Sequence, residues 1–319
     1  MFEILNPGLE VTVQDYPGRQ GYWSVGIPPS GPMDPVAFRI ANRLAGNEVS
    51  AAGLEITGLG PTIRFHDDEL VAFTGARFKA AAGGEEIPWN TPVKVSRGTV
   101  IKVGSLKGSG FRCYMAVRGG IDVPLYLGSR STFAYGHFGG FDGRRLLKGD
   151  ILNVRRDTPA IPPKMDTGIA FMPDYPHDWK IGVVPGPHGS PDFFTEEFTK
   201  KFYHTDYKVS HNTNRLGVRL DGPKPEFARK DGGEGGSHPS NMIDYTYAIG
   251  TVNFSGDVPI IIGIDGPSLG GFISYATVPT SEFWKVGQVK PGDTIRFVKM
   301  PLGEALQKQK DIETIIGLF

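Results

Sequence analysis

Three glycine-rich segments carry polar residues that a packed core does not need. The first runs, with interruptions, from Arg118 to Gly140, the second is 231–241, and the third is 262–272. Glycine has no Cβ, so its backbone approaches a ligand closely and presents N–H groups to it. These segments therefore predict binding of a small polar ligand.

Arginine and aspartate are the side chains near these segments that are best suited to chemistry. Guanidinium groups bind carboxylates through two parallel hydrogen bonds. Asp265 is a candidate base or hydrogen-bond acceptor, but Asp before Gly also simply makes turns. Solvation at the surface is the alternative role for each arginine. The candidate arginines are Arg118, Arg130, Arg215 and Arg219.

Several other kinds of site are excluded by the sequence. It contains neither a phosphate-binding glycine motif nor the Gly-x-Ser-x-Gly elbow of hydrolases, and its histidines lack zinc-ligand spacing. Lys+Arg and Asp+Glu both total 34, which gives no support to binding of nucleic acid or of a membrane surface. The one cysteine, Cys113, lies in an apolar stretch and is expected in the core.

A helix is predicted at 35–44, with Asp34 as its N-cap, Pro35 at its first position and Gly46 after its end. A loop rich in proline and glycine, 22–32, leads into it. Such a loop delivers backbone N–H groups to the positive end of a helix, where they suit a carboxylate or a polarised carbonyl. An ordinary rigid entry loop is the alternative.

The rest of the chain is predicted to be mainly β with a few helices. The 319 residues include 44 Gly and 26 Pro, spread between short apolar stretches, as in antiparallel sheets with many tight turns. We expect an N-terminal half at 1–155, a proline-rich linker at 156–178 and a C-terminal half at 179–319. Within the C-terminal half, helices are predicted at 190–202 and in a tail at 302–316, with strands from Tyr207 onward. Neither a signal peptide nor a membrane-spanning stretch is seen, so a cytoplasmic location is expected.

Several segments resemble one family over nearly the whole chain. Ser30–Asp34, Ala52–Glu55, Ala116–Val123 and Leu127–Thr132 resemble the allophanate hydrolase subunit 2 family of biotin-dependent carboxyltransferases. Further segments resemble the urea carboxylase branch of this family more than the branch formed by the C subunit of 5-oxoprolinase. These are 186–195, 214–220, 222–225, 231–234, 238–241 and 265–271.

The resemblance implies two cyclophilin-like β-barrel modules and a carboxyltransferase subunit or domain of a urea carboxylase or urea amidolyase. This activity moves the carboxyl group from carboxybiotin to a nitrogen of urea, or of a urea-like compound such as guanidine. The biotin is expected on a separate domain or protein. The expected partners are a protein or domain like allophanate hydrolase subunit 1, a biotin carboxyl carrier and a biotin carboxylase, and the chain alone is not expected to complete the reaction.

Two alternatives stay open. One is the C subunit of an ATP-dependent 5-oxoprolinase, and the other is a non-enzymatic regulator that binds a kinase inhibitor. Positions that match the family imply the site residues, and Asp265 is the first choice for the base. The implied catalytic residues are Asp265, Arg118 and Asn241. The implied residues for binding substrate or biotin are Ser30, Asp34, Glu55, Arg130, Asn214, Arg215, Ser268 and Gly270.

Overall fold

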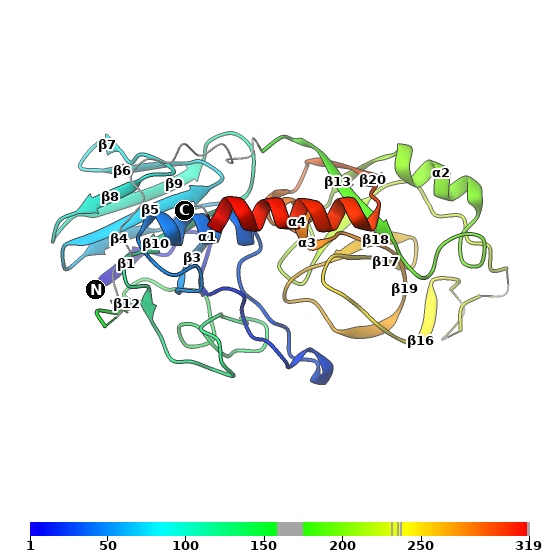
Figure 1. The fold of residues 1–319 in the computed structure, drawn as a ribbon, viewed down its shortest axis with the longest axis horizontal. Coiled ribbons are helices and arrows are strands. Elements are labelled where there is room, and N and C mark those ends of the chain that lie inside the picture. Colours follow the sequence, from blue (N-terminus) through cyan, green and yellow to red (C-terminus); the bar gives the residue numbers. More distant parts are fainter. Residues whose placement is uncertain (158–174, 231, 235, 237, 318–319) are drawn as a thin grey trace. The chain divides into compact units, whose positions relative to one another are not determined.

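The computed structural model describes residues 1–157, 175–230, 232–234, 236 and 238–317 (Figure 1). The chain divides into two compact units. Unit 1 comprises Met1–Gln20, Pro29–Tyr175 and Glu313–Phe319, and unit 2 comprises Gly21–Pro28 and Pro176–Ile312. Most of the predicted linker at 156–178 lies outside the described residues. Among the helices described, none combines the length and the apolar character needed to cross a bilayer.

Unit 1 contains two antiparallel sheets. The first has the order β11 (Ile121–Asp122), β12 (Ile151–Val154), β1 (Phe2–Asn6), β4 (Thr62–Phe65), β9 (Val100–Leu106), β6 (Phe78–Ala82) and β7 (Glu85–Glu86). The second has the order β2 (Glu10–Gln14), β3 (Gly53–Thr57), β10 (Arg112–Val117), β5 (Glu69–Gly75) and β8 (Pro92–Val95). Apolar residues of both sheets, such as Phe2, Ile63 and Phe73, form one buried core. Cys113 belongs to this core, as predicted, and burial raises the pKa of its thiol.

Helix α1 (Pro35–Leu44) of unit 1 confirms the prediction for this segment. The Asp34 carboxylate accepts hydrogen bonds from the backbone N–H groups of Val36 and Ala37, at 3.1 and 2.9 Å. These bonds satisfy donors that have no partner inside the helix. Gly46 follows the helix with φ +76°, the left-handed conformation that glycine adopts without cost. The helix packs on β5 and β10.

Unit 2 contains a closed barrel of seven strands. Its order is β13 (Asp178–Pro185), β20 (Thr294–Lys299), β14 (Asp206–Val209), β15 (Gly217–Asp221), β18 (Val258–Ile262), β17 (Thr251–Ser255) and β19 (Leu269–Thr277). Strand β19 pairs back onto β13, which closes the barrel, and its first half also pairs with β16 (Asn241–Thr246). The pairing of β13 with β20 is parallel. The prediction of a mainly β chain with barrel structure is confirmed.

Helix α2 (Glu196–His204) lies in the segment predicted as a helix at 190–202, but it begins later. Thr195 has extended backbone dihedrals, and its hydroxyl accepts a hydrogen bond from the N–H of Phe198 at 3.0 Å. Because an N-cap residue lies outside the helix, α2 begins only after Thr195. The predicted apolar face is confirmed: the rings of Phe194 and Phe198 stack at 5.2 Å, and Phe202 continues the row.

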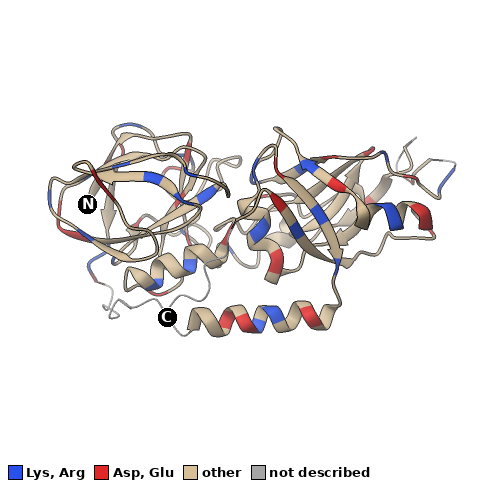
Figure 2. Ribbon diagram, turned by 90° about the horizontal axis from the view of Figure 1, so that it is seen from above, with Lys and Arg blue, Asp and Glu red and all other residues tan. Residues whose placement is uncertain are grey.

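Two further helices belong to the C-terminal part of the chain. Helix α4 (Leu302–Gly317) confirms the predicted helical tail. Helix α3 (Thr280–Gln288) falls where only strands were predicted. Most of its residues are buried, including Phe283, Trp284 and Val286, so its sequence lacks the polar face that marks a surface helix. Acidic and basic residues are interspersed on the elements of each unit (Figure 2), in agreement with the zero net charge.

Candidate functional site

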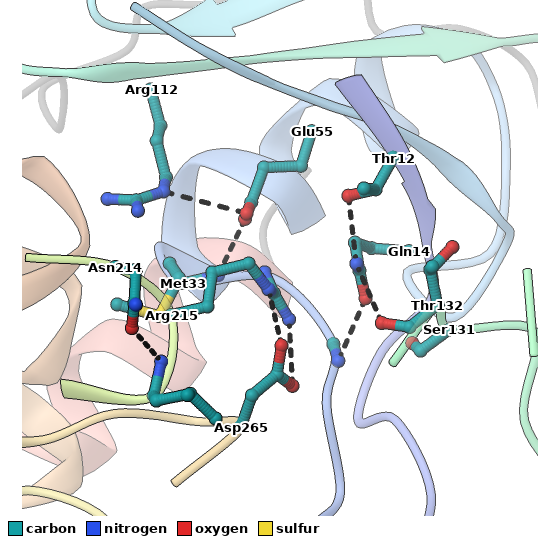
Figure 3. Close-up of polar contacts among 12 residues, drawn as sticks. Thr12, Gln14, Met33, Glu55, Arg112, Ser131, Thr132, Asn214, Arg215 and Asp265 are labelled. Carbon is teal, nitrogen blue, oxygen red and sulfur yellow. Dashed lines mark hydrogen bonds and ion pairs between the residues drawn. The ribbon is translucent and has the colours of Figure 1, made fainter. Parts of the chain in front are cut away.

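The predicted site residues are distributed over both units. In unit 2, two of them, Arg215 and Asp265, form a buried bidentate ion pair. The Arg215 Nε lies 2.7 Å from Asp265 Oδ2, and its Nη2 lies 3.2 Å from Oδ1 (Figure 3). The two side chains are only 8% and 6% exposed. A bidentate pair of this kind fixes both groups in one orientation.

The positions of Arg215 and Asp265 follow from one strand pairing. Arg215 lies before β15 and Asp265 lies after β18, and these antiparallel strands place Gly217 opposite Ile262. The N–H of Asp265 also donates to the carbonyl oxygen of Arg215 at 3.1 Å. A Cβ at Gly263 would lie 2.1 Å from that same carbonyl oxygen, so glycine is required for this close approach.

Asn214, the residue before Arg215, is used in a local turn. Its side-chain oxygen accepts a hydrogen bond from the N–H of Leu216 at 2.8 Å (Figure 3). Such a turn is a common role of asparagine, and it sets the backbone that carries Arg215. The structure therefore brings Asn214, Arg215 and Asp265 together on two adjoining loops.

The other predicted residues of unit 2 lie on or beside the pair β16–β19. Asn241 is the first residue of β16 and is paired with Phe272. The buried Ser268 accepts a hydrogen bond from the N–H of Tyr247 through its carbonyl oxygen, at 2.8 Å. A Cβ at Gly270 would lie 2.8 Å from the Tyr247 hydroxyl. Glycine at this position therefore makes room for the tyrosine.

In unit 1, Glu55 holds the loop that enters α1. One of its carboxylate oxygens accepts hydrogen bonds from the Met33 N–H at 2.7 Å and from the Tyr114 hydroxyl at 2.9 Å. The other oxygen lies 3.5 Å from Arg112 Nε (Figure 3). Burial first, and then the negative charges of Glu55 and Asp34, raise the pKa of Tyr114. Tyr114 is therefore a neutral hydrogen-bond donor to Glu55.

Ser30 lies in the same loop and has an unusual position. Its backbone is left-handed, with φ +56°, and its side chain is fully buried. Within the part of the chain that is described, its hydroxyl has no hydrogen-bond partner. Buried polar groups of native proteins nearly always have a partner, so this hydroxyl is an exception among the described side chains of unit 1.

Asp15 also belongs to this region, although it was not among the predicted site residues. Its carboxylate accepts hydrogen bonds from the hydroxyls of Ser129 and Ser131, both at 2.6 Å, and from the N–H of Arg130 at 2.7 Å. Arg130 itself uses its side-chain Nε to donate to the Val123 carbonyl at 3.0 Å. Asp15 thus shapes the whole Ser129–Ser131 loop.

Gln14 links this loop to the entry loop of α1. Its side-chain oxygen accepts the N–H of Gly31 at 3.0 Å, and its amide nitrogen lies 3.3 Å from the carbonyl oxygen of Thr132 (Figure 3). The buried carboxamide therefore fixes the backbone next to Ser30 from a second side. Its side chain gave no signal in the sequence, because a glutamine that ends a strand has no distinctive pattern.

Arg118 stands apart from these contacts. Its backbone N–H donates to the Leu70 carbonyl at 2.8 Å. Its guanidinium makes neither a hydrogen bond nor an ion pair with the residues that the structure describes. Two cavities of about 650 and 710 Å³ open beside β6 to β9 of unit 1, and none of the predicted site residues lines them.

The fold and these contacts define a two-module β protein whose polar loops are fixed by buried carboxylates and arginines. The chain belongs to the family described as "Carboxyltransferase domain, subdomain A and B", whose model matches residues 25–299. The resemblance stated from the sequence is thereby confirmed.

Relatives of two kinds are similar to this chain. Urea amidolyase of Lachancea kluyveri is 50% identical over 99% of this chain and 18% of its own length. The C subunit of 5-oxoprolinase from Escherichia coli is 32% identical over 98% of this chain and 95% of its own length. The solved structure of Kluyveromyces lactis urea carboxylase matches 98% of this chain and 29% of its own, with a TM-score of 0.93 and 48% identity. The chain thus spans less than a third of the urea amidolyase and urea carboxylase chains.

Proposed function

We propose that this chain is the carboxyltransferase component of a biotin-dependent urea carboxylase or urea amidolyase. The identity of 50% to a urea amidolyase, over nearly the whole chain, carries this proposal. The 5-oxoprolinase relative, at 32%, is more distant. Urea is therefore the first substrate, and guanidine, a planar compound with a third nitrogen in place of the urea oxygen, is the second.

Biotin, borne on a separate domain or protein, supplies the carboxyl group attached to a ureido nitrogen. In the transfer, the bond from this carbon to the donor nitrogen breaks and a bond to the substrate nitrogen forms. The proton that leaves the substrate nitrogen ends on the donor nitrogen. The Ser30 hydroxyl, which has no hydrogen-bond partner among the described residues, is one of the groups proposed to bind the substrate or biotin.

Arg215 is suited to hold the negative charge of a carboxylate, because a guanidinium stays charged at any physiological pH. Asp265 was implied to be the base, and its geometry suggests a second role. Both of its oxygens are engaged by Arg215, so it orients the guanidinium and keeps it in place. Asn241 and the backbone N–H groups of the glycine loops remain the proposed donors for the substrate oxygen.

The proposed partners are a protein or domain like allophanate hydrolase subunit 1, a biotin carboxyl carrier and a biotin carboxylase. The relatives support partners in general: the matched region is 18% of one urea amidolyase and a named subunit in 5-oxoprolinase. We expect the isolated chain to lack urea-dependent turnover because it carries neither the donor nor the components that charge it.

The test is a reconstitution with these components, or with the other subunits of a 5-oxoprolinase, followed by ADP release with urea, guanidine or 5-oxoproline as the added amide. Urea-dependent ADP release that requires this chain supports the proposal. Release that depends on 5-oxoproline instead identifies the C subunit of a 5-oxoprolinase, the alternative that the match over 95% of that relative favours. In that case the urea proposal is abandoned.

A further inference from the structure

Three buried polar residues of unit 2, Asn253, Ser274 and His188, are linked by hydrogen bonds. Asn253 of β17 lies opposite Ser274 of β19, and the Ser274 hydroxyl lies 3.2 Å from the side-chain oxygen of Asn253. His188 follows β13, and its backbone N–H donates a hydrogen bond to the Ser274 carbonyl oxygen at 3.2 Å. All three residues are buried. None of them was among the predicted site residues.

The hydrogen bonding of His188 fixes its tautomer. The backbone N–H of Ser274 donates to His188 Nδ1 at 2.8 Å, and a backbone N–H can only donate. Nδ1 therefore carries no proton, and the single ring proton lies on Nε2. Burial first, and then the positive charge of Arg229, lower the pKa of His188, while Glu234 opposes this effect. The imidazole is consequently neutral at physiological pH, with Nε2–H as its donor.

Aromatic rings hold the imidazole on two sides. The ring of Phe193 lies 4.6 Å from it and the ring of Tyr245 lies 4.4 Å from it, centroid to centroid. Tyr245 is paired with Gly270 across β16 and β19. His188 therefore lies against the strand pair that carries two predicted site residues, Asn241 and Gly270. Among the residues described, none accepts a hydrogen bond from its Nε2.

We propose that His188 binds the substrate, donating a hydrogen bond from Nε2–H of a neutral imidazole to a carbonyl or carboxylate oxygen. This rests on the proposed carboxyltransferase function and adds a residue to it. A donor held in place before the reaction stabilises negative charge that develops on the oxygen and needs no rearrangement to do so. The backbone N–H of Ser274 and the rings of Phe193 and Tyr245 supply that fixation.

Two substitutions of His188 test the roles of its two ring nitrogens separately. In His188→Asn the amide oxygen takes the place of Nδ1 as acceptor for Ser274, and the donor at Nε2 is lost. In His188→Gln the amide nitrogen takes the place of Nε2, and the acceptor for Ser274 is lost. His204→Asn is the matched control, because His204 is exposed at the end of α2.

The variants are compared in the complete reconstituted enzyme by amide-dependent ADP release and by thermal unfolding. We expect His188→Asn to unfold near the wild-type temperature and to lose about 100-fold in kcat/KM. We expect His188→Gln to unfold at a lower temperature and to keep turnover within about tenfold of wild type. His204→Asn should match wild type in both measurements.

Wild-type turnover by His188→Asn, or a larger loss in His188→Gln than in His188→Asn, overturns the role of His188 as a donor to substrate. The wild-type chain is assayed with urea and guanidine in the reconstituted carboxylase, and with 5-oxoproline after the other 5-oxoprolinase subunits are added. Turnover of 5-oxoproline alone overturns the proposed function, and the two variants then test His188 with that substrate. Turnover of none of the three amides overturns both proposals.

Discussion

The guanidinium of Arg215 and the carboxylate of Asp265, 50 residues apart in the chain, form a buried bidentate pair at 2.7 and 3.2 Å. A carboxylate that acts as a base must have an oxygen free to accept the proton. A carboxylate that only orients an arginine can have both oxygens bonded to the guanidinium. Asp265 therefore has two possible roles, and a double-mutant cycle distinguishes them.

The cycle consists of Asp265→Asn, Arg215→Lys and the double variant. If Asp265 acts by orienting Arg215, each single variant loses on the order of 100-fold in urea turnover. The double variant should then lose little more activity than either single variant, because the two residues act together and either substitution already removes their joint effect. A base acting independently gives losses that multiply in the double variant. Steady-state kinetics of the reconstituted enzyme measure this.

Ser30→Ala should separate stability from function. The buried hydroxyl lacks a partner among the described residues, so its removal deletes an unsatisfied group and leaves the free energy of unfolding unchanged or raises it by about 1 kcal/mol. If the hydroxyl binds the ligand, the same variant loses about tenfold or more in urea turnover. Denaturant unfolding and kinetics test the two effects. A large loss of stability with normal turnover would contradict this account.

Glu55→Ala should be strongly destabilising. The substitution removes the acceptor for Met33 N–H and the Tyr114 hydroxyl, and it takes the carboxylate away from the buried Arg112. Breaking a buried ionic contact of this kind costs about 3–5 kcal/mol. Glu86→Ala is the control, because the Glu86 side chain is 55% exposed and its ion pair with Arg77 is worth at most about 1 kcal/mol. Similar losses in both variants would contradict the structural role of Glu55.

Glu282 predicts a defined dependence of stability on pH. Burial alone raises its pKa, but hydrogen bonds from Lys285 and the Gly182 N–H, with the charge of Lys308, outweigh burial and hold the pKa below 4.5. A lowered folded-state pKa gives stability that is present above the unfolded-state value and is lost as pH falls through the folded-state value. The difference in unfolding free energy between wild type and Glu282→Gln should therefore shrink as pH falls below about 4.5. A difference that grows with acidity would contradict it.

Gly263→Ala should disturb the Arg215 loop. The new Cβ would lie 2.1 Å from the Arg215 carbonyl oxygen, so the backbone must move, at a cost of about 1–3 kcal/mol. Because this backbone carries the guanidinium, urea turnover should fall as well. Gly303→Ala is the control, since a Cβ there meets no atom within 4 Å and alanine favours the helix α4. Unfolding curves and kinetics compare the two variants.

Elements with strong local signals were predictable from the sequence. Asp34 and Pro35 mark the start of α1, and Gly46 marks its end, because capping depends on a few adjacent residues. Helix α3 was missed because burial on most of its sides removes the periodic pattern on which prediction rests. The start of α2 was placed too early because Thr195, its cap, lies inside a stretch that is otherwise compatible with a helix.

The contacts of the candidate site depend on pairings that the sequence does not show. Arg215 and Asp265 meet because β15 lies beside β18, and nothing near either residue specifies that neighbour. Asp15 was not predicted as a site residue, because an aspartate in a turn gives the same local pattern whether or not it binds a distant loop. His188 was noticed only as part of a segment that resembles the family. The role of its ring depends on a hydrogen bond from Ser274, 86 residues away, which no local pattern reveals.

The parallel pairing of β13 with β20 has a consequence for how unit 2 is made. These strands are the first and the last of the barrel in chain order, and Asp178 pairs with Thr294. During synthesis, the barrel lacks its last strand, β20, until Lys299 has emerged from the ribosome. Until then β13 has an uncovered edge, which is a risk for wrong association with other chains. The barrel of unit 2 therefore cannot close before translation has passed its last strand.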